Sequence, residues 1–236
     1  MLKKEMVWAG VLVMAVSACV TAAPITVPNG SFEAPVLADG QYGGNVAIPP
    51  WNSVTVWREV TNPSGSDVAP FPSGMVGASG NGTPQGGDGT NVLYMHQGAN
   101  GSEGRIFVST DGVTALGTYT LTVAVGTLSN KQSHGFTIAI YDTDSGYSGG
   151  AKHTGLGSEL TPGTLVDKSV TWTVTDPDMV GRGILVSLGI SANPSAVTGC
   201  TLFDNVRVDF TPVPEPGTMA LVAMGSTAWV LKKKRL

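Results

Sequence analysis

The sequence predicts an all-β fold, a jelly-roll β-sandwich built from residues 24–211. No helical periodicity of convincing length appears in these residues, and alternating or β-branched runs recur between clusters of Gly, Pro, Asn and Asp. Charged residues make up only 13% of the 236-residue chain, with 32 Gly and 15 Pro. A hydrophobic content of 42% is enough for the core of one domain of this length.

Eight segments are expected to be strands. The clearest is 118–125, in which apolar residues alternate with Thr and Ala. Segment 166–175 places Trp172 on one face with two valines, so Trp172 is expected in the core. The other expected strands are 54–60, 91–96, 105–109, 136–141, 183–190 and 202–210. The Gly- and Pro-rich stretch 62–90 is expected to form loops at one edge, either as binding loops or as an excursion without function.

The first 23 residues have the layout of a secretory signal peptide. Lys3 and Lys4 precede an apolar run, and small residues follow at 21–23, where cleavage is expected after Ala23 or Ala22. An alternative is lipidation, because the residues before Cys19 loosely match a lipoprotein box, which would leave the protein anchored through that cysteine.

The last 25 residues form a tripartite tail. Pro214-Glu215-Pro216 leads into a mostly apolar segment, 217–231, and a basic cluster closes the chain. As a short apolar helix, fifteen residues would rise about 22 Å, less than the ~30 Å hydrocarbon core of a bilayer. We therefore expect a weak or transient membrane association, with the basic cluster on the cytoplasmic side.

This tail resembles the PEP-CTERM sorting signal of Gram-negative bacteria. The resemblance implies export by the secretion machinery, recognition by an exosortase and cleavage near Pro214, Glu215 and Pro216. It also implies delivery to the cell surface or matrix of a bacterium that makes exopolysaccharide and biofilm.

Charge counting excludes several functions. The formal net charge is −4, but the six terminal cations hide an interior with seven cationic and fifteen acidic residues, a net charge of −8. So few cations exclude a strongly basic nucleic-acid binder. Two cysteines exclude a multi-disulfide scaffold, and Cys200, the one left after signal removal, is expected to be buried.

Three patterns in residues 24–211 resemble carbohydrate-binding-module-like, galactose-binding-like jelly rolls. They are Asn29-Gly-Ser-Phe-Glu33, Trp51 after two prolines, and Phe203-Asp204-Asn-Val-Arg-Val208. The resemblance implies a structural Ca²⁺ held by Glu33 and Asp204, because the first and last strands of such folds are neighbours and Ca²⁺ binds several oxygens. The alternatives are a solvated carboxylate pair, or an Asp204 that hydrogen-bonds a turn. Weaker cation candidates are Asp39, Asp88, Asp142 and Asp144.

Weak glycan or exopolysaccharide binding is the function expected of this domain. Trp57 and Tyr147 are the candidate sugar-stacking residues, whereas Trp51 is expected in the core under Phe32. The three histidines form no metal motif and no Gly-x-Ser-x-Gly sequence occurs, so we expect no catalytic residue. The alternatives are a surface enzyme acting on polysaccharide, since the acids allow a carboxylate pair, and a structural or adhesive protein without a specific ligand.

Overall fold

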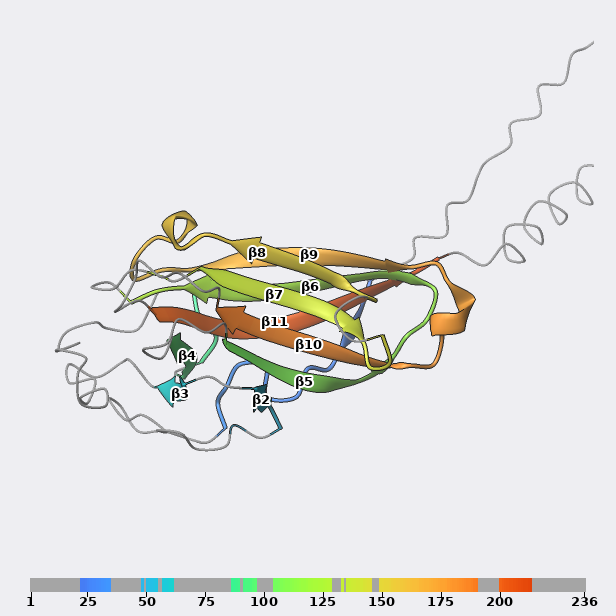
Figure 1. Ribbon diagram of the computed structural model, residues 1–236, viewed down its shortest axis with the longest axis horizontal. Helices are drawn as coiled ribbons and strands as arrows, with labels where there is room; N and C mark the ends of the chain where they lie inside the picture. Colours follow the sequence, from blue (N-terminus) through green and yellow to red (C-terminus); the bar gives the residue numbers. More distant parts are fainter. Residues whose placement is uncertain are drawn as a thin grey trace, which may run out of the picture.

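The computed structural model describes residues 22–34, 48, 50–54, 57–61, 86–89, 91–96, 104–128, 133, 135–145, 149–190 and 200–213. Two antiparallel sheets packed face to face account for most of them (Figure 1). This arrangement confirms the predicted all-β sandwich. The expected signal peptide, the apolar segment 217–231 and the Pro-Glu-Pro motif lie outside the described residues.

The six-stranded sheet has the order β3-β4-β11-β6-β9, and β1 pairs with β11 beyond this path. The last strand is therefore central, with β4 and β6 on its two sides and β1 along its final residues. The strands are β1 (Ala23–Ile25), β3 (Trp57–Thr61), β4 (Val92–His96), β6 (Gly117–Gly126), β9 (Leu165–Val174) and β11 (Cys200–Pro212).

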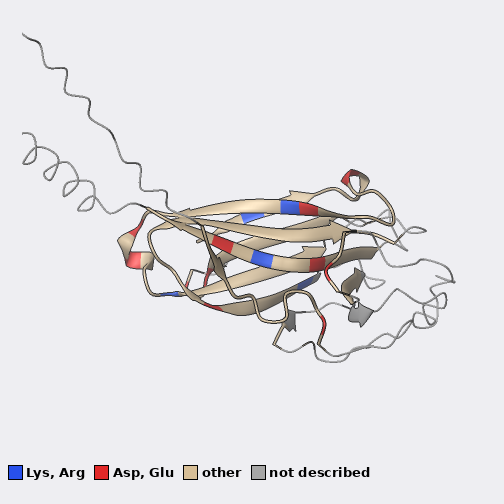
Figure 2. Cartoon of the chain, turned by 180° about the vertical axis from the view of Figure 1, so that it is seen from behind, with Lys and Arg blue, Asp and Glu red and all other residues tan. Residues whose placement is uncertain are grey.

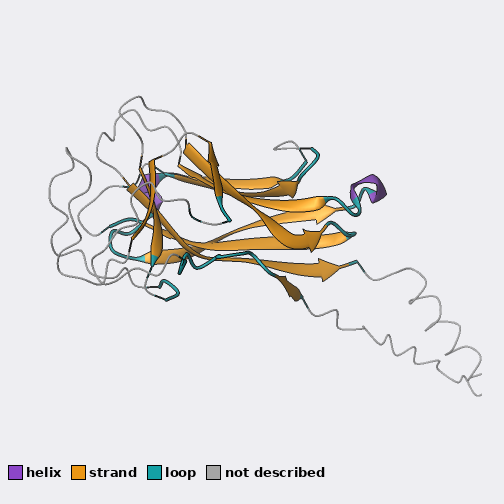
Figure 3. Ribbon diagram, turned by 90° about the horizontal axis from the view of Figure 1, so that it is seen from below, coloured by secondary structure: helices purple, strands orange, loops and turns teal. Residues whose placement is uncertain are grey.

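The five-stranded sheet has the order β2-β5-β10-β7-β8. Its strands are β2 (Asn52–Val54), β5 (Gly104–Val113), β7 (Phe136–Asp142), β8 (Ala151–Gly155) and β10 (Gly183–Ile190). Two short 3-10 turns, η2 (Gly157–Glu159) and η3 (Pro177–Met179), lie at opposite ends of the sandwich (Figure 3).

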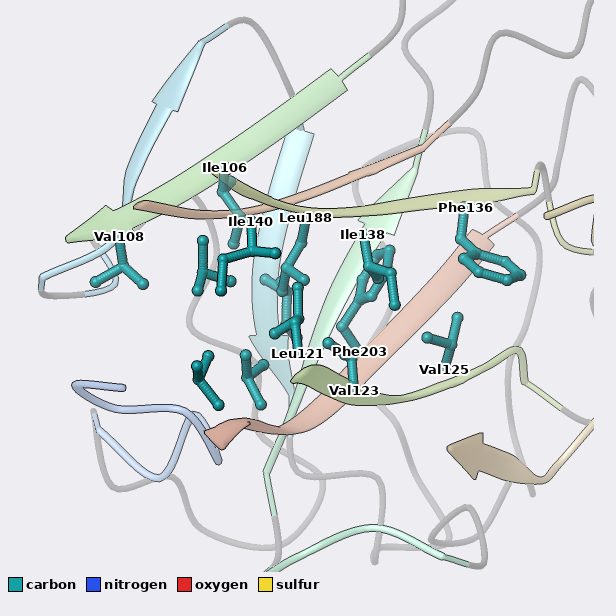
Figure 4. Packing of buried hydrophobic residues seen from close by; sticks show 14 of the residues in the cluster. Ile106, Val108, Leu121, Val123, Val125, Phe136, Ile138, Ile140, Leu188 and Phe203 are labelled. Carbon is teal, nitrogen blue, oxygen red and sulfur yellow. The ribbon is translucent and has the colours of Figure 1, made fainter. Parts of the chain in front are cut away.

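The core fills the space between the two sheets. In β6, Tyr119, Leu121, Val123 and Val125 are at most 1% exposed, whereas the threonines between them are partly exposed. Because side chains alternate across a strand, one apolar row meets the matching rows of the opposite sheet. Figure 4 shows this interdigitation, with Leu121, Val123 and Phe203 facing Ile138, Ile140 and Leu188. Trp172 and Trp51 are buried in this core, as predicted.

A second, smaller apolar cluster lies on the outer side of the six-stranded sheet. It consists of Val92, Tyr94, Ala124, Leu128, Leu165, Cys200 and Leu202. Residues 86–89 lie against it, since a Cβ on Gly86 would be 2.5 Å from the carbonyl oxygen of Leu165. Cys200 is fully buried here, which confirms the expectation for this thiol.

The predicted strands differ from the observed ones at three places. The expected strand 54–60 is wrong: it spans the end of β2 and most of β3, which belong to different sheets. Strands β1 and β8 were not expected. Both lie at sheet edges and are short, and β8 exposes Lys152 and Thr154, so neither carries the apolar alternation that marks a half-buried strand.

The two ends of the sandwich differ in what they carry. At one end the chain enters β1 and leaves β11, beside the turn 114–116 and η3; we call it the terminal end (Figure 1). The opposite end carries η2 and the last residues of β6. Among the described residues, no helix combines the length and apolar character needed to cross a membrane.

Candidate functional site

A tight turn after β1 positions the first candidate carboxylate, Glu33. The Asn29 side chain binds the backbone of Ala34 in both directions, donating at 2.8 Å and accepting at 3.1 Å. Asn29 and Phe32 both have positive φ angles, 50° and 57°, so the chain reverses sharply here. Phe32 packs on Trp51 with ring centroids 5.3 Å apart, and Trp51 donates its indole N–H to the Asn29 carbonyl at 3.2 Å. The expected contact of Trp51 with the Phe32 segment is confirmed.

A bulge in the last strand positions the second candidate, Asp204. The pairing of β11 with β6 shifts register between Asp204 and Arg207, and Asn205 takes a positive φ of 47°. The Asp204 side chain lies on the outer face of the six-stranded sheet and is fully buried. Its two carboxylate oxygens accept backbone N–H groups, Oδ1 from Asn205 at 2.7 Å and Oδ2 from Asp88 at 2.6 Å.

Residues 86–89 and 91 connect the two carboxylates; we call them the acidic strap. The Asn91 N–H donates to Glu33 Oε1 at 2.8 Å, while the Asp88 N–H binds Asp204. Two glycines make room for this approach. A Cβ on Gly87 would lie 2.7 Å from Asp204 Oδ2, and one on Gly89 would lie 2.4 Å from Glu33 Oε1. The structure therefore brings Glu33 and Asp204 to one place, through a segment that carries the weaker candidate Asp88.

The electrostatics of this cluster disfavour ionisation of Asp204. Burial above all, together with the negative charges of Asp88 and Glu33, raises the pKa of Asp204 to about 7, although hydrogen bonds from the backbone N–H groups of Asp88 and Asn205 oppose the shift. A buried carboxylate beside two acids is stabilised by a proton or by a cation. Of the alternatives, the structure supports an Asp204 that hydrogen-bonds a turn.

The described side chains of this cluster supply only oxygen donors. Among the described residues no group of three or more His, Cys, Asp or Glu side chains is arranged to hold a metal ion. Within this part of the chain the cluster offers the carboxylates of Glu33 and Asp204, each of which accepts a backbone N–H of the acidic strap. Ca²⁺ accepts backbone carbonyl and water oxygens in the remaining positions, whereas a transition metal would require side-chain nitrogen or sulfur.

The weaker candidates Asp142 and Asp144 do not form a cation site. Arg182 donates to Asp142 Oδ1 at 3.3 Å and lies 3.8 Å from Asp144 Oδ2, so this guanidinium supplies the positive charge. Although burial opposes ionisation, hydrogen bonds from Ser145, Asp144 and Arg182 hold the pKa of Asp142 below its ordinary value. The remaining weak candidate, Asp39, lies outside the described residues.

The side chains of the two predicted sugar-stacking residues, Trp57 and Tyr147, lie outside the described part of the structure. Tyr147 lies outside the described residues, and Trp57 belongs to β3 but its side chain is not described. No aromatic side chain in the described part of the chain is exposed; Phe107 and Phe210 are half-buried. Of the histidines, His153 is held between Phe136, with ring centroids 5.4 Å apart, and the Ser169 carbonyl at 3.1 Å.

A double row of hydroxyl groups lies on the outer face of β6 and β9, and we call it the hydroxyl face. The register pairs Thr118 with Thr173, Thr120 with Thr171 and Thr122 with Ser169. Side-chain oxygens lie 3.4 Å apart in the first pair and 2.9 Å apart in the third. The alternation of Thr with apolar residues in 118–123 predicts the row of hydroxyls on β6. The second row, on β9, is found only from the register that pairs β9 with β6.

Comparison with known proteins matches two parts of the chain. The HpiC1-like family model, described as HpiC1 cyclase, matches residues 23–209, and the PEP-CTERM protein-sorting motif matches residues 212–235. None of the curated proteins compared with the chain matches it. The sorting motif marks an exported protein that an exosortase processes at the membrane, as its resemblance implied.

Two solved structures illustrate the likeness in fold. A Stig cyclase, Fisc from Fischerella sp. TAU in complex with (3Z)-3-(1-methyl-2-pyrrolidinylidene)-3H-indole, has a TM-score of 0.62 at 19% identity, covering 82% of this chain and all of that one. The apo form of a cyclase from Fischerella sp. has a TM-score of 0.62 at 20% identity, covering 82% and 98%. The matching family is thus named for a cyclase, and the expected likeness to carbohydrate-binding modules stays a prediction.

Proposed function

The chain belongs to the HpiC1-like family, whose model matches residues 23–209. For this member, which also carries a sorting motif, we propose a cell-surface protein whose β-sandwich binds extracellular polysaccharide weakly and without catalysis. The observation that carries the proposal is the hydroxyl face, a set of six Thr and Ser side chains on the outside of the sandwich, bordered by Asp209 and by the Arg207–Asp167 ion pair. Exosortase sorting brings this face to the surface or the matrix, where polysaccharide is abundant.

The chemistry of the hydroxyl face suits a polyhydroxylated partner. Each Thr or Ser hydroxyl both donates and accepts a hydrogen bond, and each Thr adds a methyl group that packs on the C–H face of a sugar. Ser169, Thr171 and Thr173 are exposed, and the three threonines of β6 are partly exposed. Exposed hydroxyls lose water when they bind, so each contact contributes little net free energy. Binding therefore gains strength from many copies along one polymer.

Retention on polysaccharide tests this proposal. Thr120→Val, Thr122→Val and Thr171→Val together remove three hydroxyls at constant volume, and we expect retention of the exported protein on host exopolysaccharide to fall several-fold. The matched control is Thr137→Val with Thr154→Val, a hydroxyl pair 3.2 Å apart on the outer face of the other sheet. Equal retention of both variants would contradict the role of the hydroxyl face. Failure of the unaltered protein to bind any polysaccharide would contradict the function itself.

We also propose that a Ca²⁺ ion binds between Glu33 and Asp204. Both carboxylates lie at the acidic strap, and a cation there would offset the burial and the charge repulsion that together raise the pKa of Asp204. The ion would fasten the N-terminal turn, the acidic strap and the last strand to one another, which is a structural contribution. Backbone carbonyls and water would complete its coordination.

A second candidate function is a cyclase or another surface enzyme. It is favoured by the family and by the carboxyl of Asp204, since a buried carboxyl protonated near neutral pH is a typical proton donor. Against it, both oxygens of Asp204 are bound to backbone N–H groups under the acidic strap, so a substrate would have to displace the strap. Product formation from an indole-bearing substrate, lost in Asp204→Asn, would establish this candidate in place of the first.

A further inference from the structure

Exposed apolar side chains gather at the terminal end of the sandwich. Within the described residues six large apolar side chains are exposed, and four of them lie at this end: Val113 (60%), Leu116 (41%), Val180 (50%) and Val213 (51%). Single exposed apolar residues are ordinary on a protein surface, but a group of them marks an interaction surface. We call these four residues the terminal rim.

Hydrogen bonds hold the segments that carry the terminal rim together. Thr114, next to Val113, donates its N–H to the Arg182 carbonyl at 2.7 Å and accepts from Gly181 at 2.8 Å. The N–H of Val213 donates to the Leu116 carbonyl at 3.3 Å. These hydrogen bonds join three segments that are distant in sequence into one surface. The segments are the β5–β6 turn, the η3 turn and the end of β11.

The chain length beyond β11 places this surface close to a membrane. The apolar segment begins at Gly217, only four residues after Val213. Four residues reach at most about 14 Å when fully extended. While residues 217–231 are inserted in a bilayer, the terminal end of the sandwich must therefore lie within that distance of the lipid headgroups.

We propose that the terminal rim is a lipid-docking surface that seats the sandwich end-on against the bilayer before sorting. The inference rests on the proposed insertion of residues 217–231. Short apolar side chains at the rim enter the headgroup region and add their buried area to an anchor that is itself too short to span. End-on seating also confines Pro214, Glu215 and Pro216 to a thin layer at the membrane surface, where a membrane protease has access to them.

The charges at this end identify the type of lipid surface. The η3 turn carries Asp176 and Asp178 and appears acidic in Figure 2. Among the described residues of this end, the cation Arg182 is paired with Asp142 and Asp144. The described surface therefore offers anionic headgroups no unpaired positive charge, so docking depends on apolar burial and proceeds on zwitterionic lipid.

Hydrogen exchange on the full chain tests the proposal without any substitution. The unprocessed protein is bound to phosphatidylcholine vesicles, and its amide exchange is compared with that of the lipid-free protein. We expect slower exchange in residues 113–117 and 177–182 and unchanged exchange in residues 154–166 at the opposite end. Vesicle binding without this protection would overturn the docking surface and leave the anchor intact, whereas failure to bind vesicles would overturn both. Protection in lipid-free protein that grows with protein concentration would show an interface between copies and would also overturn the proposal.

Substitutions give a second readout. Val113→Ser, Leu116→Ser and Val180→Ser together should lower the vesicle partition coefficient of the full chain about tenfold. The control is Leu156→Ser with Val166→Ser, because these are the other two exposed apolar residues of the described chain and lie at the far end. It should change partitioning less than about twofold. Unchanged melting temperatures would show that both variants fold, and equal loss in both would contradict the proposal.

Discussion

Asp88 binds Asp204 through its backbone rather than its side chain, with its N–H 2.6 Å from Asp204 Oδ2. The strap is therefore attached to the last strand by a group that cannot be removed by side-chain substitution, while the Asp88 carboxylate adds negative charge nearby. The geometry of the cluster is set by the backbone and its electrostatics by three side chains, so the two can be perturbed separately.

Substitution of Gly89 tests the geometry. In Gly89→Ala the new Cβ would lie 2.4 Å from Glu33 Oε1 at a φ of +79°, so we expect a loss of about 2–3 kcal/mol in the free energy of unfolding by urea. Gly181→Ala is the matched control, since its φ is +88° but nothing lies within 4 Å of the Cβ. It should cost only about 1 kcal/mol, the backbone strain alone. Equal losses would show that the strap moves aside freely.

Calcium binding is tested by thermal melting of Glu33→Gln, which keeps the oxygen that accepts the Asn91 N–H and removes the charge. Calcium at about a hundred times its dissociation constant adds about 2.7 kcal/mol, so the unaltered protein should melt several degrees higher in calcium than in EDTA. The variant should lose most of this difference and, in EDTA, melt no lower than the unaltered protein. Identical melting of the unaltered protein in calcium and EDTA would exclude the ion.

The lowered pKa of Asp142 predicts that the folded protein loses stability in acid. This pKa is held below the ordinary value of 3.8, so the unfolded chain takes up the proton first and the contribution to stability is present above about pH 4. That contribution is lost as the pH falls through the lower, folded-state pKa. Asp142→Asn should cost about 2–3 kcal/mol at pH 7 and flatten the melting temperature between about pH 4 and 2. Asp209→Asn, on the outer face of β11, serves as control; the same flattening there would contradict this assignment.

Tyr119 joins the core to the β5–β6 turn. Its hydroxyl accepts from the Ala115 N–H at 2.7 Å and donates to the Ala115 carbonyl at 3.2 Å, and burial raises its pKa against the effect of that backbone bond. Tyr119→Phe keeps the ring contacts with Trp172 and Phe210 but leaves the Ala115 N–H without its acceptor. We therefore expect the free energy of unfolding by urea to fall by about 1–2 kcal/mol. A change below about 0.3 kcal/mol would mean that water replaces the hydroxyl.

Alternation in the sequence predicts the strands that line the core and little beyond them. The strand predicted at 118–125 is confirmed, because one face of β6 is buried and the other is partly exposed. Strand β8 was missed because an edge strand rich in polar residues needs no apolar row. The strand expected at 54–60 failed because alternation carries no information about which sheet a residue joins.

The sequence predicts the two carboxylates of the candidate site but not the segment that joins them. The meeting of Glu33 with Asp204 followed from a resemblance, and the structure brings the two together. The acidic strap did not follow, because its Gly-rich composition is that of any loop and its role depends on two backbone N–H groups. The hydroxyl face required the register of β6 against β9, which joins residues about fifty positions apart.

The central position of β11 has a consequence for the order of events during export. This strand lies between β4 and β6 and also holds β1, yet among the described strands it comes last in the sequence. Until residue 212 has passed the translocation channel, the six-stranded sheet lacks its middle and the first strand has no partner. The sandwich therefore closes only when the residues next to the sorting motif are available, so completion of the fold coincides with presentation of that motif.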